Sequence, residues 1–112
     1  MKRNVQSAQA GCRIIAFIAN AAGTALTGID AKQVTMTDTG PGIKTIELGG
    51  NLFSSASDYV VQVTTATAGT TAQVSITDKD TFVINTFDDS TGAIATDAIC
   101  HVLVIGANSE RR

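Results

Sequence analysis

The stretch Ile99-Cys100-His101-Val102-Leu103-Val104-Ile105, closed by Gly106, decides the fold predicted for this chain. Alternate side chains of an extended strand point to opposite faces. Here both faces are apolar apart from one histidine, with Ile99, His101, Leu103 and Ile105 on one face and Cys100, Val102 and Val104 on the other. Burying a large aliphatic side chain contributes about 1.5–3 kcal/mol. The run is therefore predicted to lie in the centre of a packed β structure or against a neighbouring subunit.

A second strand of the same character lies near the start of the chain, at Cys12 to Ala19. Its alternating sets are also both apolar, so the two strands are candidates for neighbours in one sheet. A half-exposed strand has one apolar face and one polar face, whereas each of these strands has two apolar faces. We assign that surplus face to a subunit contact. The residues predicted to make this contact are Ile15, Phe17, Cys100, Val102 and Val104.

The remaining apolar segments alternate with polar residues and are separated by Gly, Asn, Asp and Ser. Ile, Val and Thr are abundant, and β-branched residues favour strands. Residues 20–31 are predicted as a loop that can include a short extended piece. The other predicted strands cover residues 33–37, 44–48, 59–65, 72–77 and 81–87, and residues 33–48 form a hairpin.

These segments predict an all-β fold, a single antiparallel β-sandwich or small barrel of about seven strands. Residues 1–10 are polar and aperiodic and are predicted to be an N-terminal arm. The sandwich domain then covers residues 11–106, and residues 107–112 form a C-terminal tail. A chain of 112 residues is sufficient for one domain with a modest core.

Charge and hydropathy argue against nucleic acid and membrane as partners. The chain is 16% charged with a net charge of −2, and its basic residues are scattered, whereas phosphate binding needs clustered Lys and Arg. No apolar window reaches the length of a membrane span. The apolar run after Arg13 is too short for the core of a signal peptide, so the chain is expected to be unexported.

The residues that carry chemistry form no assembled pattern. Cys12 and Cys100 lack metal-ligand spacing and are expected to be buried and reduced, although a disulfide between the first and last strands is geometrically possible. His101 is the one histidine and points away from Cys100, so those two residues form no dyad. We expect no catalytic residue, no metal ion and no cofactor, and no enzyme activity.

Two clusters of polar residues have alternative interpretations. Asp78, Asp80, Asp88, Asp89 and Asp97 could gather around Ca²⁺, but they lack the spacing of an EF-hand loop and are expected to form turns. The threonine-rich stretch 64–71 could bind carbohydrate through its hydroxyl groups. Ordinary strand and loop usage is the simpler interpretation, since the chain has no Trp for sugar stacking.

Three stretches together resemble a known family. They are residues 34–42 (VTMTDTGPG), residues 58–61 (DYVV) and residues 90–106, which end in HVLVIG. They resemble the small β domains of tailed-bacteriophage virion proteins, which occur in fibres, spikes and capsid decoration proteins. The resemblance covers about residues 33–106, and Pro41 departs from the polar residue usual at its position.

The resemblance implies a structural function in the virion and supplies no catalytic residues. The leading hypothesis is a capsid decoration or cement protein that binds and stabilises the lattice of the major capsid protein as a homo-oligomer. Family analogy favours a trimer. The alternative is a tail- or head-fibre module that recognises a host-surface receptor. That alternative predicts exposed aromatic or carboxylate clusters in the loops, and the low aromatic content counts against it.

Overall fold

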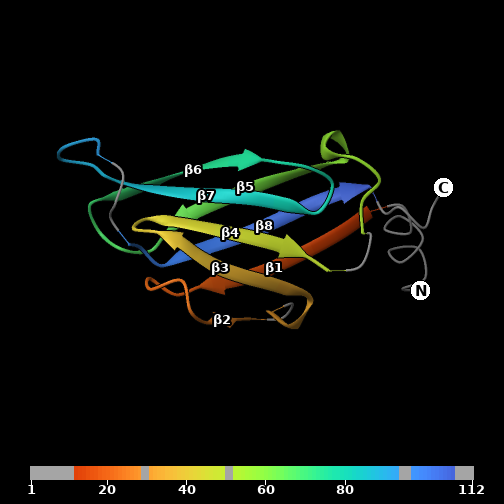
Figure 1. The fold of residues 1–112 in the computed structure, drawn as a ribbon, viewed down its shortest axis with the longest axis horizontal. Helices are drawn as coiled ribbons and strands as arrows, with labels where there is room; N and C mark the ends of the chain where they lie inside the picture. The colour runs from red at the N-terminus through yellow and green to blue at the C-terminus, as the bar shows by residue number, and fades with distance from the viewer. Residues whose placement is uncertain (1–11, 29–30, 50–51, 94–96, 108–112) are drawn as a thin grey trace, which may run out of the picture.

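The computed structural model describes residues 12–28, 31–49, 52–93 and 97–107. In it, two four-stranded antiparallel sheets pack face to face as a sandwich (Figure 1). The predicted all-β sandwich is therefore confirmed. The arm predicted at 1–10 lies outside the described residues, as does the predicted tail apart from Ala107, which ends the last strand.

Sheet A has the strand order β2-β1-β8-β5, and sheet B has the order β3-β4-β7-β6. The strands of sheet A are β1 (Cys12–Ala19), β2 (Leu26–Thr27), β5 (Tyr59–Thr65) and β8 (Cys100–Ala107). Those of sheet B are β3 (Val34–Gly40), β4 (Ile43–Leu48), β6 (Thr70–Ile76) and β7 (Thr81–Asp88). Two 3-10 turns, η1 (Ala31–Gln33) and η2 (Ala56–Asp58), precede β3 and β5.

The closing strand β8 lies inside sheet A, between β1 and β5. Its whole length pairs with β1, from Cys100 opposite Ala19 to Ala107 opposite Cys12. Its other edge pairs with β5, from Cys100 opposite Thr65 to Gly106 opposite Tyr59. The prediction that the first and last strands are neighbours is thereby confirmed.

The loop predicted at residues 20–31 does include a short extended piece, β2, which pairs with the end of β1. Asn20 organises the turn before it, because its side-chain Oδ1 accepts hydrogen bonds from the backbone N–H groups of Thr24 (2.9 Å) and Ala25 (3.1 Å). An asparagine side chain that accepts hydrogen bonds from nearby backbone N–H groups takes the place of strand pairing and fixes a turn.

The predicted hairpin over residues 33–48 is formed by β3 and β4. β3 continues to Gly40, past the predicted start of the turn, and the ladder is irregular between Asp38 and Gly40. The chain reverses at Pro41 and Gly42, and Gly42 has a positive φ of 70° that glycine adopts without strain. Asp97 tethers this turn through its Oδ1, which accepts the Gly42 N–H at 2.8 Å.

The core lies between the inner faces of the two sheets. Its fully buried or nearly buried hydrophobic residues are Ile15, Phe17, Ala19, Val34, Ile46, Leu48, Phe53, Tyr59, Phe82, Ile84, Ala98, Cys100, Val102 and Val104. One charged residue, Lys44, is buried with them on the inner face of β4, and its Nζ donates to the carbonyl oxygen of Ala98 at 3.2 Å. The alternation that places Ile46 and Leu48 inside also places Lys44 inside. The burial of Lys44 is unexpected for a charged side chain.

The missing side chain of Gly106 makes room for an aromatic stack at one end of the core. Tyr59 lies opposite Gly106 in the ladder, and its ring stacks on Phe53 with centroids 4.8 Å apart. A Cβ atom at Gly106 would lie 2.5 Å from Tyr59 Cβ and 2.6 Å from a Phe53 ring carbon. The glycine that closes the apolar run therefore leaves the space that these two rings fill.

The five predicted contact residues require a correction. Ile15, Phe17, Cys100, Val102 and Val104 are all buried between the two sheets of a single chain, each at most 3% exposed. They are core residues and are not accessible to a neighbouring subunit. β1 and β8 do carry a surplus apolar face, but it is formed by the opposite alternating set.

Candidate functional site: an apolar outer face of sheet A

Sheet A presents an outer face in which three strands align in three rows. We call it face A, and it consists of Ile14, Ala16 and Ile18 of β1, His101, Leu103 and Ile105 of β8, and Val60, Gln62 and Thr64 of β5. Cross-strand neighbours on one face are about 4.5–5.5 Å apart at Cβ, so the rows are continuous. Leu103 lies in the middle of the middle row, between Ala16 and Gln62.

Face A is apolar and uncharged. Six of its nine side chains are hydrophobic, and no carboxylate, ammonium or guanidinium group stands among them. Ile14 is 47% exposed and Val60 is 59% exposed. A third exposed hydrophobic residue, Ile99 at 39%, precedes β8 on the same alternation as His101. Within the described residues, these three are all of the large hydrophobic side chains that are exposed.

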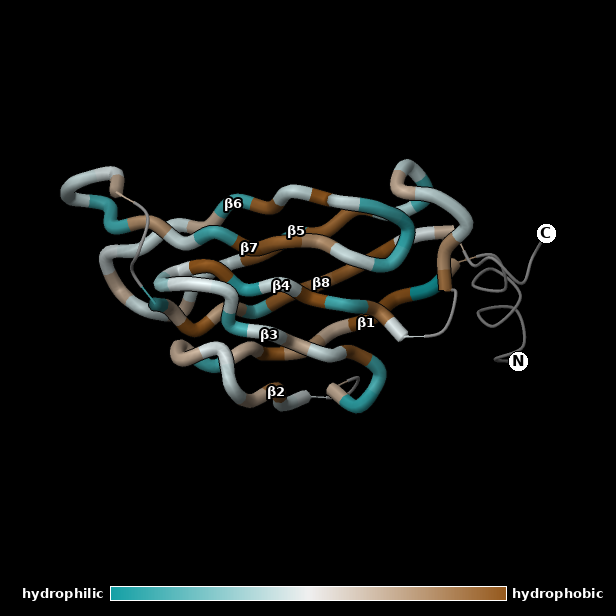
Figure 2. Tube along the Cα trace, in the orientation of Figure 1, coloured by the Kyte–Doolittle hydropathy of each residue, from teal (hydrophilic) through white to brown (hydrophobic). Residues whose placement is uncertain are grey.

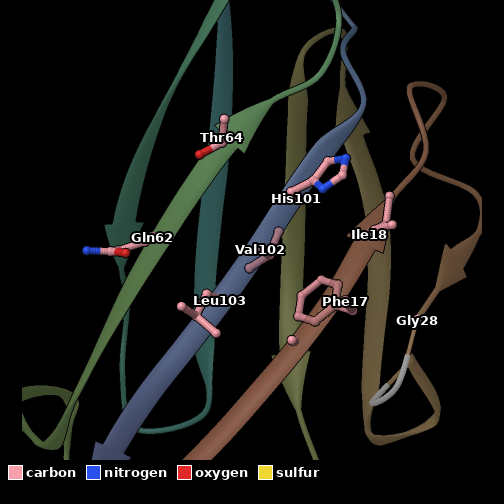
Figure 3. A pocket seen from close by; sticks show the side chains of 9 residues that line it. Phe17, Ile18, Gly28, Gln62, Thr64, His101, Val102 and Leu103 are labelled. Carbon is pink, nitrogen blue, oxygen red and sulfur yellow. The ribbon is translucent and has the colours of Figure 1, made fainter.

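A shallow, open groove of about 380 Å³ runs over one end of face A (Figure 3). Its polar edge is formed by Gln62, Thr64 and His101, and its apolar floor includes Ile18 and Leu103. Gly28 closes the side next to β1. A Cβ at Gly28 would lie 3.2 Å from Phe17 Cα, and its φ is 115°, so glycine permits the chain to cross the edge of β1 at this point.

His101 is exposed on face A, and its cross-strand neighbours are Ile18 and Thr64. Neither supplies the carboxylate that orients a catalytic or metal-binding imidazole. The preceding residue, Cys100, points into the core, where burial raises the pKa of its thiol. The two side chains lie on opposite sides of the sheet, as the alternation predicted.

The two cysteines lie at opposite ends of the β1–β8 ladder. Cys12 faces Ala107 and Cys100 faces Ala19, so seven residue steps, or about 23 Å, separate them. Disulfides require Cα atoms within about 7 Å. Both thiols are free, and an intrachain disulfide is excluded by this geometry.

Two of the aspartates considered as calcium ligands, Asp78 and Asp88, cap separate turns. Asp78 Oδ1 accepts the Asp80 N–H at 3.0 Å, and Asp88 Oδ1 accepts the Ser90 N–H at 2.8 Å and its hydroxyl at 2.7 Å. These hydrogen bonds hold the pKa of both carboxyl groups below its ordinary value. Across the described part of the chain, no three His, Cys, Asp or Glu residues gather as a metal site.

The threonine-rich stretch forms the end of β5, its loop and the start of β6. Thr65 donates its hydroxyl to the Thr70 carbonyl oxygen at 2.8 Å, and Thr70 donates to that of Thr67 at 2.6 Å. Thr67 in turn accepts the Ile99 N–H at 3.0 Å. These hydroxyl groups hold the hairpin and tie it to Ile99, the residue before β8, so Thr65, Thr67 and Thr70 have structural partners.

The outer face of sheet B, which we call face B, is polar. Its residues are Thr35, Thr37, Ile43, Thr45, Glu47, Thr71, Gln73, Ser75, Thr81, Val83, Asn85 and Phe87. Its three hydrophobic members, Ile43, Val83 and Phe87, are only partly exposed. Along the backbone, Figure 2 shows hydrophobic colour over most of β8 in sheet A, whereas β3 in sheet B is mostly pale or hydrophilic.

No helix of the described residues is long and apolar enough to cross a membrane. Comparison with known proteins gave no match to a family model, a curated protein or a solved structure.

Proposed function

We propose that this chain is a structural protein that works in an assembly through face A, and that the assembly is a virion. In this proposal it is a capsid decoration protein that binds the lattice of the major capsid protein as a homo-oligomer. The virion context is supplied by the resemblance of residues 33–106 to bacteriophage virion domains. The observation that supports an assembly function is the uncharged apolar surface of face A.

The energetics of face A favour a covered state. Ile14 and Val60 each keep about half of their surface in water, and removing that surface contributes on the order of 1 kcal/mol per side chain. Charge depletion is also typical of the centre of a protein–protein interface. A nucleic acid would instead require clustered basic side chains, and face A carries none.

Capsid binding tests this proposal. The purified protein is expected to cosediment with capsids that lack it and to raise the temperature at which those capsids open. Val60→Asp places a charge on face A and is expected to reduce cosedimentation at least about tenfold, since a charge in an interface core is costly to desolvate.

Thr45→Asp is the matched control, because it places the same charge at the centre of face B. This variant is expected to bind capsids as the unchanged protein does. Failure of the unchanged protein to bind, or equal loss with both variants, would overturn the proposal.

A fibre module that recognises a host-surface receptor is the second candidate, and the groove on face A favours it. Gln62, Thr64 and His101 offer hydrogen-bonding groups beside an apolar floor, an arrangement that suits a small polar ligand. A glycan array read with the unchanged protein tests this candidate. Saturable binding that Gln62→Ala abolishes would favour it over capsid decoration.

A further inference from the structure

We infer that the free edge of β6 is a pairing surface, and that its partner is β6 of a second copy of this chain, added antiparallel across a twofold axis at Val74. The pair makes one continuous sheet from the sheets B of two chains. This inference concerns a strand edge and not face A, so it goes beyond the capsid contact proposed above. It gives a pair, whereas family analogy favours a trimer.

Every second residue of β6 points its backbone N–H and C=O groups away from the sheet. Thr77, directly after β6, donates its N–H to the carbonyl oxygen of Thr81 at 2.9 Å. Because the direction of hydrogen bonding alternates along an antiparallel ladder, Ala72, Val74 and Ile76 point these groups to the open side. The three residues are partly exposed. Among the described residues, their backbone groups form no hydrogen bond.

The neighbouring edge of β5 is less accessible than that of β6. The two strands lie together along one long side of the sandwich and are joined by residues 66–69 (Figure 1). Tyr59 at the start of β5 is 3% exposed, and Thr65 at its end donates its hydroxyl group to the Thr70 carbonyl oxygen at 2.8 Å. The longer run of accessible backbone groups is therefore on β6.

The β5–β6 hairpin also lacks the features that protect a strand edge from pairing. Proteins usually protect such edges with charged side chains, proline or a bulge. Residues 59–76 contain no Asp, Glu, Lys, Arg or Pro, and the ladders of both strands run without a register shift. A regular, unprotected edge is a template for another extended strand.

The opposite side of the sandwich is protected, which favours a closed pair. There β2 contains only two residues, the β3 ladder is irregular between Asp38 and Gly40, and Pro41 follows. A head-to-tail contact would join β6 of one copy to this protected side of the next, whereas a twofold contact uses the β6 edge twice. Because β6 carries no charge, its self-pairing brings no like charges together. The partner that fits is therefore a second copy.

The free backbone groups fix the register of the pair. With Val74 opposite its own counterpart, Ala72 lies opposite Ile76 of the second copy, so all three residues form hydrogen-bonded pairs. On the outer side of the sheet, Gln73 then lies opposite Ser75 of the second copy, and these polar side chains are close enough to interact.

The twofold axis of an antiparallel strand pair is normal to the sheet, so face A of both copies lies on the same side of the pair. If face A binds the capsid lattice as proposed, one pair contacts the lattice at two points, which strengthens binding without a new contact. This consequence rests on the proposed function, whereas the pairing itself does not.

Amide hydrogen exchange of the full chain, followed by NMR, tests the pairing residue by residue. A pair held by one short strand edge is expected to have a dissociation constant on the order of 100 µM. Raising the concentration from about 20 µM to about 1 mM is then expected to slow exchange at Ala72, Val74 and Ile76 about fourfold. Met36 is the control, because its N–H points to the free side of β3 and its exchange is expected to stay unchanged.

Ala72→Pro tests the same edge by substitution. It removes an N–H that points away from β7, and proline is tolerated at such positions of an edge strand. Each copy loses one hydrogen bond to the other, so sedimentation equilibrium is expected to show association at least about tenfold weaker. Met36→Pro removes an equivalent N–H from β3 and is expected to pair like the unchanged chain. Thermal unfolding shows whether each variant is folded.

Three results would overturn the inference: an unchanged chain that stays monomeric up to about 1 mM, slowed exchange at other residues but not at Ala72, Val74 and Ile76, or a folded Ala72→Pro chain that pairs like the unchanged one. If Ala72→Pro does not fold, the exchange measurement decides alone. A monomeric chain that still cosediments with capsids would refute the pair and leave the decoration function standing. A pair with no affinity for capsids would do the reverse.

Discussion

Faces A and B are the outer surfaces of two sheets of equal strand number, and they differ in what they leave in water. Six of the nine residues of face A are hydrophobic, whereas nine of the twelve of face B are polar. When the outer face of a sheet borders solvent, polar residues occupy alternate positions along its strands, as they do in sheet B. The difference shows that the outer side of sheet B is an ordinary polar surface, whereas sheet A, among the described residues, is apolar on both its inner and its outer side.

The strand β8 contains this difference within itself, because its two sides are both apolar and only one is covered. Val104 is 0% exposed in the core, and Leu103 is half-buried on face A. Val104→Asp is therefore expected to cost more than about 4 kcal/mol of unfolding free energy and to prevent folding, since it buries an unpaired charge.

Leu103→Asp, one residue away, is expected to remain folded, because this side chain is only half-buried on the outer face of the sheet. Circular dichroism with urea titration separates the two variants. A folded Val104→Asp protein, or an unfolded Leu103→Asp protein, would mean that the inner and outer sides of β8 are reversed.

The β5 residues of face A, Val60, Gln62 and Thr64, depend on how β5 is held against β8. Gly106→Ala is expected to lower the free energy of unfolding by about 2–4 kcal/mol, because the new Cβ would overlap Tyr59 Cβ and the Asp58 carbonyl oxygen, each 2.5 Å away. Urea unfolding measures the loss.

Gly40→Ala is the matched control in sheet B, since a Cβ there meets only a side-chain atom of Ile43, at an ordinary 3.5 Å. It is expected to change stability by less than about 1 kcal/mol. Equal losses in the two variants would show that the Phe53–Tyr59 stack does not fill the space at Gly106.

The smallest expected effect concerns the hydroxyl group of Tyr59, which donates to the carbonyl oxygen of Asp78 at 2.8 Å. Burial, helped by the charges of Asp78 and Asp80, raises the pKa of Tyr59 from 10.0 to about 12. The folded chain thus holds the phenolic proton more tightly than the unfolded chain does. This contribution to stability is complete below pH 10 and is lost as the pH rises through 12.

Tyr59→Phe is expected to cost about 1 kcal/mol near neutral pH, the typical net worth of one hydrogen bond, and to remove this part of the alkaline loss. The chain has one tyrosine, so phenolate absorbance reports this group alone. A titration midpoint near pH 10 in the folded protein would contradict the burial of the hydroxyl. Comparing unfolding free energies of both proteins between pH 10 and pH 12 isolates the tyrosine from other titrating groups.

Much of the fold followed from local patterns. The predicted strand Cys12–Ala19 has the bounds of β1, and the hairpin of β3 and β4 followed from its alternating residues and its Gly-Pro-Gly turn. The burial of Lys44 and the packing of two aromatic residues against Gly106 were not predicted. Both depend on neighbours from other strands, Ala98 for the ammonium group and Phe53 with Tyr59 for the glycine.

The five residues predicted to form a contact surface on β1 and β8 lie in the core of the single chain. The sequence by itself determined that β1 and β8 have two apolar faces and that each face consists of alternate residues, because the period of a strand is fixed by its backbone. It could not determine which set faces the core, since hydrophobicity is nearly equal on the two sides.

The tertiary structure decided that choice by packing. Cys100, Val102 and Val104 face sheet B and are at most 3% exposed. Gly106 continues the same alternating set opposite Tyr59, and the space left by its missing side chain is filled by Tyr59 Cβ and the Phe53 ring. Because alternate residues of a strand point to opposite faces, Leu103 and Ile105 must then lie on the outer face. Which alternating set is exposed is thus decided by packing between residues far apart in the chain.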